Sequence, residues 1–272
     1  MRDFSNLKNL AWLCRMDALT AIYNAQSGHP GGSFSAAELI VGLYFHAMNI
    51  DPSNPQWPDR DRMILSKGHA SPLLYAVLAR RGFFPLEDVY SMRTFGSPLT
   101  STPSLKVPGC DMSSGSLGQG LSIGLGMALA GKADGKSYRV YVLLGDGENQ
   151  EGQVWEAAMA SAHHRAENLV AIIDRNHVQM CGTTDDILDP GDIASKYSAF
   201  GWNTLVIDGH DMAAVIAALD RRFENGKPTA IVAETVKGKG VSYMEGRFEW
   251  HGAAPDKEHY ELAMQELRGH LR

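Results

Sequence analysis

Two short polar segments follow two apolar runs of this chain, and their side chains are suited to binding a hard cation. Gly145-Asp146-Gly147 comes directly after the run 139–144, and Asn176 comes shortly after the run 169–174. A carboxylate and an amide oxygen side by side suit Mg²⁺ or Ca²⁺, and Mg²⁺ takes its remaining ligands from phosphates and water. The glycines that flank Asp146 would let the backbone approach a bulky ligand. We therefore predict a divalent cation site that phosphate oxygens complete.

For these side chains to meet, the two apolar runs must be neighbouring strands of a parallel sheet. Residues 139–144 and 169–174 have the composition of buried strands, and residues 154–162 between them carry apolar side chains at helical spacing. Such a unit makes a parallel pair whose carboxyl ends lie where open α/β sheets bind ligands. The alternative is that Asp146 and Asn176 merely belong to polar turns. An EF-hand does not fit, because the glycine offset is wrong and no acidic residue closes the loop.

The rest of the chain predicts the same architecture, an α/β fold with three αβα layers and a mostly parallel sheet. No repeat, low-complexity tract or linker divides the sequence, so we expect residues 1–272 to form one domain. Ser33 is the expected N-cap of the second helix. Further strands are predicted at 62–65, 204–208 and 229–235, and helices at 6–26, 33–48, 72–81, near 86–93, near 193–200, after 211, and at 256–272.

Two histidines lie in glycine-containing turns that could face a ligand. His29 lies within Ser27-Gly28-His29-Pro30-Gly31, and His69 lies in the turn between strand 62–65 and the next helix. Free N–H groups and the helix dipole favour anions at a helix N-terminus, so His69 could donate a hydrogen bond to a phosphate there. The simpler alternative is that both are ordinary loop histidines.

The segment 115–131 is dense in glycine, which costs a helix roughly 1 kcal/mol per site relative to alanine. We expect compensation from close approach to a ligand at one end and to another helix along the rest. The spacing Gly118-x-Gly120-x-x-x-Gly124 does not match a dinucleotide fingerprint. Lys237-Gly238-Lys239-Gly240 resembles a phosphate loop, but it lacks the P-loop spacing and terminal Ser/Thr, so a nucleotide site is poorly supported.

Composition narrows the class of protein. The chain has 272 residues, 44% of them hydrophobic, and a net charge of -6. It contains no basic block, so we expect no nucleic-acid partner, and no apolar run of membrane-spanning length, so we expect no membrane partner. The first residues lack the apolar core of a signal peptide. The scattered Cys14, Cys110 and Cys181 suit a reducing compartment, and we expect a cytoplasmic protein.

These motifs resemble those of the transketolase family, in its N-terminal, thiamine diphosphate-binding half. Gly145-Asp146-Gly147 and Asn176 are similar to the thiamine diphosphate signature, whose Asp and Asn bind the metal that holds the diphosphate. The resemblance extends from the first helix to about Pro255. The segments that narrow it to this family occur in family order: Ser27-Gly28-His29-Pro30-Gly31, Leu65-Ser66-Lys67-Gly68-His69-Ala70, Gly115-Ser116-Leu117-Gly118-Gln119-Gly120 and Trp250-His251-Gly252.

The resemblance implies a role for each matching residue. Asp146, the Asn176 side chain and the Val178 backbone carbonyl would bind Mg²⁺, for which Ca²⁺ or Mn²⁺ can substitute, with diphosphate oxygens and water completing an octahedron. His29 and His251 would be catalytic, donating hydrogen bonds or relaying protons at the bound sugar. Contacts with the cofactor are implied for His69, Gly115, Ser116, Leu117, Gly147, Glu151 (at the interface between two cofactor sites), Asn176 and His251.

The resemblance also implies a reaction and a partner. A transketolase transfers a two-carbon ketol (glycolaldehyde) unit from a ketose to an aldose or aldehyde acceptor. Full-length members continue for two more domains, which supply the glutamate that activates the cofactor and most cationic groups that bind the sugar phosphate. The family pattern therefore implies a split enzyme, an α2β2 heterotetramer with a C-terminal subunit. The alternatives are another thiamine diphosphate enzyme, such as a 2-oxoacid dehydrogenase α subunit or a deoxyxylulose phosphate synthase, and a non-catalytic relic kept for assembly or regulation.

One segment departs from the family pattern. The family usually has Gly-His-Pro before Pro108-Gly109, and its histidine reaches the first hydroxyls of the donor. The matching residues here are Ser101-Thr102-Pro103, so a small hydroxyl replaces an imidazole at the mouth of the substrate site. We therefore expect an unusual ketose donor, such as a branched or sulfonated sugar, with cofactor binding unaffected.

Overall fold

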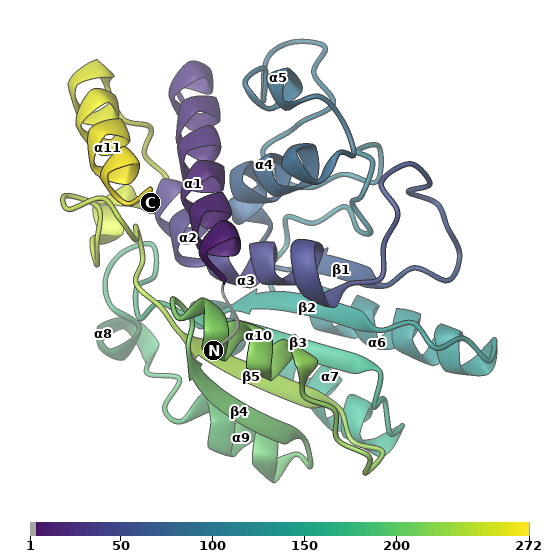
Figure 1. The fold of residues 1–272 in the computed structure, drawn as a ribbon. Helices are drawn as coiled ribbons and strands as arrows, with labels where there is room; N and C mark the ends of the chain where they lie inside the picture. Colours follow the sequence, from purple (N-terminus) through teal and green to yellow (C-terminus); the bar gives the residue numbers. More distant parts are fainter. Residues whose placement is uncertain (1–3, 272) are drawn as a thin grey trace.

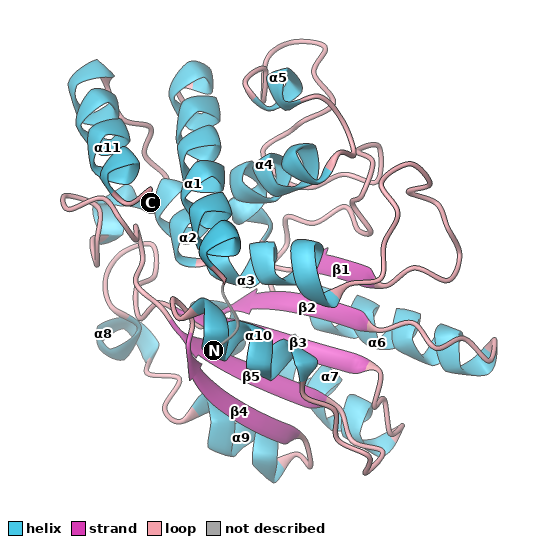
Figure 2. Ribbon diagram, in the orientation of Figure 1, coloured by secondary structure: helices cyan, strands magenta, loops and turns pink. Residues whose placement is uncertain are grey.

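A five-stranded parallel sheet forms the centre of the computed structural model, which describes residues 4–271 (Figure 1). Every pair of neighbouring strands is parallel, so the arrows in Figure 2 point the same way. Each strand lies within one residue of its predicted bounds, which confirms the predicted sheet. In spatial order the strands are β1 (Arg62–Leu65), β2 (Val140–Gly145), β3 (Leu169–Arg175), β5 (Thr229–Glu234) and β4 (Asn203–Asp208).

Helices cover both faces of the sheet, as predicted for three αβα layers (Figure 2). Along β2, Tyr141 and Leu143 belong to the apolar cluster on one face, whereas Val140 and Val142 belong to the other cluster. Successive strand residues point to opposite faces, so a strand covered on both sides is apolar throughout. The first layer contains α1 (Ser5–Ala25), α3 (Ala37–Gly42), α4 (Ser71–Arg81) and α10 (Met212–Asp220), and the second contains α6 (Gln119–Ala133), α7 (Gly152–His163) and α9 (Ile193–Ala199).

Shorter elements complete the fold and carry several of the polar segments singled out above. The remaining α-helices are α2 (Pro30–Ser35), α5 (Leu86–Val89), α8 (Thr184–Leu188) and α11 (Lys257–Gly269). A π-helical turn spans Leu43–Ala47, and 3₁₀ turns span Gly68–Ala70, Gly147–Gln150 and Phe248–Trp250.

The predicted helix 33–48 is wrong in its start and in its continuity. The helix begins at Pro30, because a proline tolerates the first helical position, where no N–H is needed. Ser33 is therefore inside α2, and its hydroxyl donates to the carbonyl of His29 at 2.7 Å instead of capping. The helical path then breaks at Ala36 and continues as α3 and the π-helical turn.

The glycines of α6 approach the sheet, whereas we expected them to approach another helix. A Cβ at Gly124 would lie 2.5 Å from Cγ2 of Val142 on β2, and one at Gly120 would lie 2.3 Å from the hydroxyl of Ser66. Real Cβ atoms do not pack this closely, so the glycines let α6 lie directly against β2 and the end of β1. This contact holds the preceding glycine loop at the carboxyl edge of the sheet.

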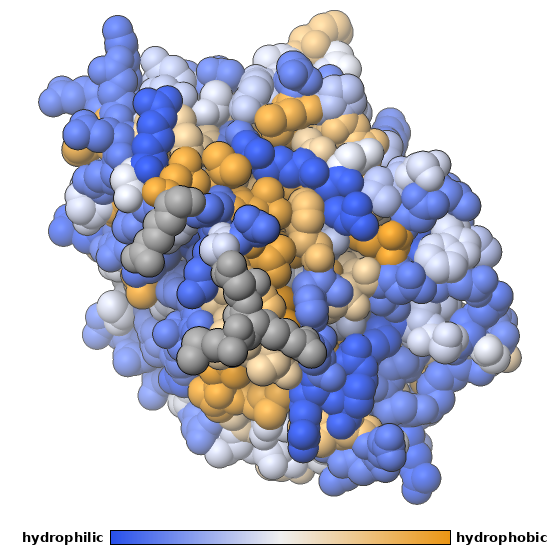
Figure 3. Space-filling view, in the orientation of Figure 1, coloured by the Kyte–Doolittle hydropathy of each residue, from blue (hydrophilic) through white to orange (hydrophobic). Residues whose placement is uncertain are grey.

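The surface seen in Figure 3 is hydrophilic around its periphery, and hydrophobic residues gather toward its middle, around α3. Within residues 4–271, no helix combines the length and apolar character that crossing a membrane requires. Cys14, Cys110 and Cys181 are all free thiols.

Candidate active site

The register of β2 and β3 brings Asp146 and Asn176 to the same edge of the sheet. Gly145 pairs with Asp174, so the chains that continue past these residues leave the sheet side by side. The two carboxylate oxygens of Asp146 accept hydrogen bonds from the backbone N–H groups of Gly147 at 2.8 Å and His177 at 2.6 Å. His177 has a φ of +63°, which few non-glycine residues adopt, and this indicates a constrained turn at the site.

Asp146 is a buried carboxylate whose hydrogen bonds come from backbone N–H groups. It is 3% exposed, and within residues 4–271 no cationic side chain forms an ion pair with it. Burial and the nearby Asp174 raise the pKa of Asp146, because both disfavour its charged form. A cation bound beside it would offset that cost. The donor chemistry at Asp146 therefore fits a divalent cation.

Asn176 is oriented by its amide nitrogen. Its Nδ2 lies 3.4 Å from a carboxylate oxygen of Asp174 and 3.4 Å from the hydroxyl of Ser35, so its Oδ1 faces the other way and accepts from the N–H of Val178 at 3.2 Å. Among the described residues, no group of three His, Cys, Asp or Glu side chains is arranged to hold a metal. A cation at this edge would therefore depend on Asp146, amide and carbonyl oxygens, and oxygens of a ligand.

Asp174 lies beneath this edge and anchors a buried lysine that the sequence analysis gave no role. Its carboxylate accepts from Lys67 Nζ and the hydroxyl of Thr235, and from the hydroxyl of Ser35 at 2.6 Å. Burial acts to raise the pKa of Asp174, but Lys67 and the hydroxyl donors outweigh it and lower the pKa. Lys67 also donates to the carbonyl of Gly32 at 2.9 Å. The ion pair places the Lys67 ammonium group at the floor of the site, with its charge balanced by Asp174.

Lys237 supplies a second buried ammonium group. Its Nζ donates to the carbonyl of Val178 at 2.9 Å and to Nδ1 of His251 at 2.8 Å. An ammonium only donates, so Nδ1 of neutral His251 accepts and its proton is on Nε2. Burial, with Lys67 nearby, lowers the pKa of Lys237 to about 8. Because Val178 is a predicted cation ligand, Lys237 would have to share or release this carbonyl when a cation binds.

Three histidines from separate sequence motifs meet beside the lysines. The ring centroids are 5.3 Å apart for His29 and His69, 5.5 Å for His29 and His251, and 5.1 Å for His69 and His251. Burial is the largest cause that lowers the pKa of each, to about 3 for His251, and nearby cations add to the effect. All three imidazoles are therefore neutral at pH 7 and can donate from one nitrogen and accept at the other.

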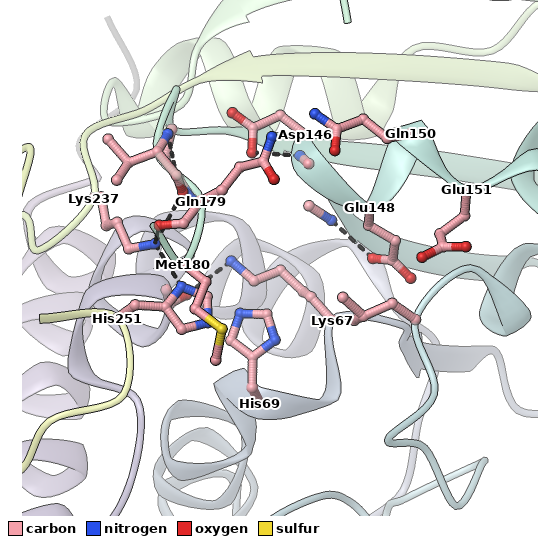
Figure 4. A pocket seen from close by; sticks show the side chains of 16 residues that line it. Lys67, His69, Asp146, Glu148, Gln150, Glu151, Gln179, Met180, Lys237 and His251 are labelled. Carbon is pink, nitrogen blue, oxygen red and sulfur yellow. Dashed lines mark hydrogen bonds between the residues drawn. The ribbon is translucent and has the colours of Figure 1, made fainter. Parts of the chain in front are cut away.

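Most of these groups line one cavity of ≈ 290 Å³, shown in Figure 4. Lysines and histidines lie on one side of it, and Asp146, Glu148 and Glu151 lie on the other. Most of the predicted site residues line the cavity, namely His69, Leu117, Asp146, Gly147, Glu151, Asn176, Val178 and His251.

The predicted residues His29, Gly115 and Ser116 do not line this cavity. His29 adjoins it through the other two histidines. Gly115 lies beside Thr102, because a Cβ on Gly115 would be 3.6 Å from Cγ2 of that threonine. The backbone of Thr102 is held by Tyr75, whose hydroxyl donates to the Thr102 carbonyl at 2.9 Å. The segment that departs from the family pattern is thus next to the glycine loop.

Two further residues were missed by the sequence analysis. Glu148 accepts from the hydroxyl of Ser66 and from the N–H groups of Gly118 at 2.9 Å and Gly145 at 3.0 Å, so it ties the glycine loop to the end of β2. Its position inside the signature was the only signal. Gln179 lines the cavity, and its buried Nε2 has no hydrogen-bond partner among the described residues. A phosphate oxygen would satisfy it, and nothing in the sequence indicated this.

Comparisons with known proteins identify the family and the fold. The profile of the family described as "Transketolase, thiamine diphosphate binding domain" matches residues 7–269. A subunit of the apulose-4-phosphate transketolase of Phocaeicola vulgatus is 42% identical over 247 residues, which are 90% of this chain and 88% of that protein. The 6-deoxy-6-sulfo-D-fructose transketolase subunit SqwG of a Clostridium species is 41% identical over 264 residues, 96% of each chain.

Longer relatives match over less than half of their length. Human transketolase is 40% identical over 270 residues, which are 98% of this chain and 42% of that protein. The crystal structure of transketolase from Campylobacter jejuni superposes with a TM-score of 0.91 at 30% identity, covering 98% of this chain and 43% of that one. A transketolase of Pichia stipitis in complex with sedoheptulose 7-phosphate gives a TM-score of 0.88 at 29% identity, with 98% and 44% covered.

Proposed function

The chain belongs to the transketolase family, as a transferase subunit with the fold of the thiamine diphosphate-binding domain, and from this premise we propose how it holds its cofactor, partner and substrate. Together with a separate C-terminal subunit, it transfers a two-carbon ketol unit from a ketose to an aldose or aldehyde acceptor. The observation that carries the proposal is the unpaired, buried Asp146 beside Asn176, facing two buried lysines across one cavity.

One group of site residues would bind the metal ion, and another would bind the diphosphate of the cofactor. Asp146, the Asn176 Oδ1 and the Val178 carbonyl would hold Mg²⁺, whose remaining ligands would be phosphate oxygens and water. The Nε2 of Gln179, and Lys237 once its contact with the Val178 carbonyl is released, would donate to phosphate oxygens. The three oxygen ligands from Asp146, Asn176 and Val178 are the support for magnesium, for which Ca²⁺ or Mn²⁺ can substitute.

When bound, thiamine diphosphate supplies the carbanion chemistry of ketol transfer. The histidines of this chain orient the substrate. Lys237 holds the His251 ring with its Nε2–H free to donate, and His29 packs edge-on to that ring. Because all three rings are neutral at pH 7, His251 can donate its Nε2–H to a sugar oxygen, and His29 and His69 can each donate to a sugar oxygen or accept a hydroxyl proton. His29 and His251 are our candidates for the catalytic groups, with His69 at the cofactor.

A second polypeptide would cover the open side of this cavity. Leu117 and Met180 line the cavity and are 38% and 66% exposed, so apolar surface lies at its rim. Two relatives are named as subunits of a transketolase, and this chain spans most of their length. We therefore propose a C-terminal subunit that docks at this rim in an α2β2 assembly, with Glu151 at the interface. The three free cysteines support a reducing, cytoplasmic location.

The donor sugar is proposed to be a branched or sulfonated ketose. The names of two relatives refer to apulose 4-phosphate and to 6-deoxy-6-sulfo-D-fructose. In this chain the small Thr102 lies beside the glycine loop, where the family usually has a histidine. A donor with a different arrangement of its first hydroxyls would not need that imidazole.

Calorimetry and a coupled assay test the proposal. We expect thiamine diphosphate to bind only with Mg²⁺ present, weakly to this chain alone and tightly with its partner subunit, and ketol transfer to require both chains. Full activity of the isolated chain would refute the split enzyme. Decarboxylation of a 2-oxoacid without ketol transfer would favour another thiamine diphosphate enzyme, and no cofactor binding even with a partner would favour a non-catalytic relic.

A further inference from the structure

A buried ion pair lies behind the segment that carries Lys237, outside the cavity. Arg15 on α1 donates to both oxygens of Glu38 on α3, at 2.7 and 2.6 Å. One of these oxygens also contacts Nδ1 of His210 at 2.9 Å. His210 lies in the turn between β4 and α10, so three separate segments meet at this carboxylate.

The contacts of His210 fix its protonation. Its Nε2 lies 2.9 Å from the backbone nitrogen of Val236, which can only donate. Nε2 therefore accepts and carries no proton, so the proton of the neutral ring is on Nδ1 and is donated to Glu38. The backbone N–H of His210 donates to Asp208, and Arg15 and the Lys239–Glu245 pair also lie near the ring. This tautomer is thus held from both sides.

Val236 is where the chain leaves the sheet and turns toward the site. The pairing of β5 with β4 ends at Glu234, whose carbonyl accepts from Gly209 at 2.8 Å, and the N–H of Thr235 still donates to Arg175. At Val236 no strand offers an acceptor, and the imidazole of His210 takes that place. The next residue is Lys237, whose Nζ contacts Val178 and His251.

We propose that His210 is a positioning residue for cofactor binding, because the Arg15–Glu38–His210 relay holds the Val236 amide and thereby places the Lys237 side chain. The relay itself is a property of this chain, and only its effect on the cofactor rests on the function proposed above. His210 does not line the cavity and touches neither the proposed cation ligands nor the substrate histidines.

Two substitutions distinguish the hydrogen bond that His210 donates to Glu38 from the one that it accepts from Val236. His210→Asn keeps a donor near the position of Nδ1 for Glu38 but is too short to accept from Val236. His210→Gln places an amide oxygen near the position of Nε2, so it can still accept from Val236. One lost neutral hydrogen bond is worth about 1 kcal/mol, which corresponds to roughly fivefold to tenfold in an equilibrium constant.

We expect hydrogen exchange at the Val236 amide to rise roughly tenfold in His210→Asn and to stay near wild type in His210→Gln. Affinity for thiamine diphosphate with Mg²⁺ should fall by a similar factor in the first variant and be retained in the second. His46→Asn is the matched control. The His46 ring contacts Asp220 at 2.9 Å and does not line the cavity, so neither readout should change.

Equal effects of the two His210 variants on exchange and affinity, in proportion to their loss of thermal stability, would overturn the proposal, because a merely structural histidine behaves that way. Nitrogen NMR of the wild-type ring gives an independent test that needs no variant. We expect a neutral Nδ1–H tautomer at pH 7, and an Nε2–H tautomer or an imidazolium would also overturn it. If the wild type binds no cofactor even with its partner subunit present, the proposed function fails, whereas exchange at Val236 still decides the relay.

Discussion

The Glu38 cluster and the Asp146 edge each bury one carboxylate almost completely, yet they balance its charge in opposite ways. Glu38 is 5% exposed and meets Arg15 and His210, whereas Asp146 is 3% exposed and accepts only backbone N–H groups. Burial acts to raise both pKa values. At Glu38 the cationic and hydrogen-bonding partners outweigh it and lower the pKa to about 2, and at Asp146 burial prevails and the pKa is raised.

We interpret this difference as one between a structural carboxylate and a ligand-binding one. A buried charge that already has its partners is a finished part of the fold, and removing either partner leaves the other uncompensated. A buried charge without a counter-ion persists only where another interaction, such as ligand binding, offsets the free-energy cost of burying it. Such groups cluster at functional sites. Substitutions at the two carboxylates should therefore affect different properties, stability at Glu38 and cation-dependent binding at Asp146.

The largest effect is expected for Glu38→Gln. The substitution leaves the Arg15 guanidinium buried without a counter-charge, so the free energy of unfolding should fall by about 3–5 kcal/mol. Urea unfolding monitored by circular dichroism measures it. Asp220→Asn is the matched control, since it breaks an exposed pair with His46 and should cost less than about 1 kcal/mol. A loss at Glu38 no larger than in this control would contradict the comparison.

Asp146→Asn should produce the opposite pattern. The amide keeps the shape but removes the charge, so Mg²⁺-dependent affinity for thiamine diphosphate should fall by about 100-fold, or roughly 2.7 kcal/mol. The free energy of unfolding without ligands should be unchanged or higher, because an uncompensated buried charge is gone. Calorimetry with and without EDTA, beside urea unfolding, measures both. A variant that loses stability but keeps its Mg²⁺ dependence would show that Asp146 is structural.

The pH dependence of stability should carry the signature of Glu38. Its pKa in the folded chain is about 2, below its ordinary value of 4.5, so its contribution is fully present above pH 4.5 and is lost as the pH falls toward 2. That loss is on the order of 3 kcal/mol. The difference in unfolding free energy between wild type and Glu38→Gln should shrink across this window. A constant difference from pH 6 to pH 3 would mean that the carboxylate does not titrate as described.

The sequence predicted those features that depend on local pattern. Apolar runs ending in Asp146 and Asn176 predicted the sheet and its polar edge, because strand composition and crossover topology leave few alternatives. The prediction of Ser33 as N-cap was wrong because Pro30 already begins the helix. Serine as a cap and proline at the first helical position are two local signals, and the second one decided the start. The partners of the lysines could not be predicted, since Lys67 and Asp174 are 107 residues apart and nothing local couples them. Lys237 likewise lies in a recognisable glycine-lysine segment, but its acceptor, the Val178 carbonyl, is identified only by the folded structure.

The smallest effect concerns the donor sugar, at the mouth of the site away from both carboxylates. Thr102→His introduces the residue type that we expect at this position in the family, and one added hydrogen bond to a donor hydroxyl is worth about 1 kcal/mol. With the partner subunit present, the ratio of kcat/KM for xylulose 5-phosphate to that for a branched or sulfonated ketose should rise roughly tenfold. Thr102→Ser keeps a small hydroxyl and should leave the ratio unchanged. Because neither substitution changes Asp146, Asn176 or Val178, the proposed cation ligands, cofactor affinity should be similar in all three proteins. An unchanged ratio in Thr102→His at equal cofactor affinity would assign donor choice to the partner subunit instead of this loop.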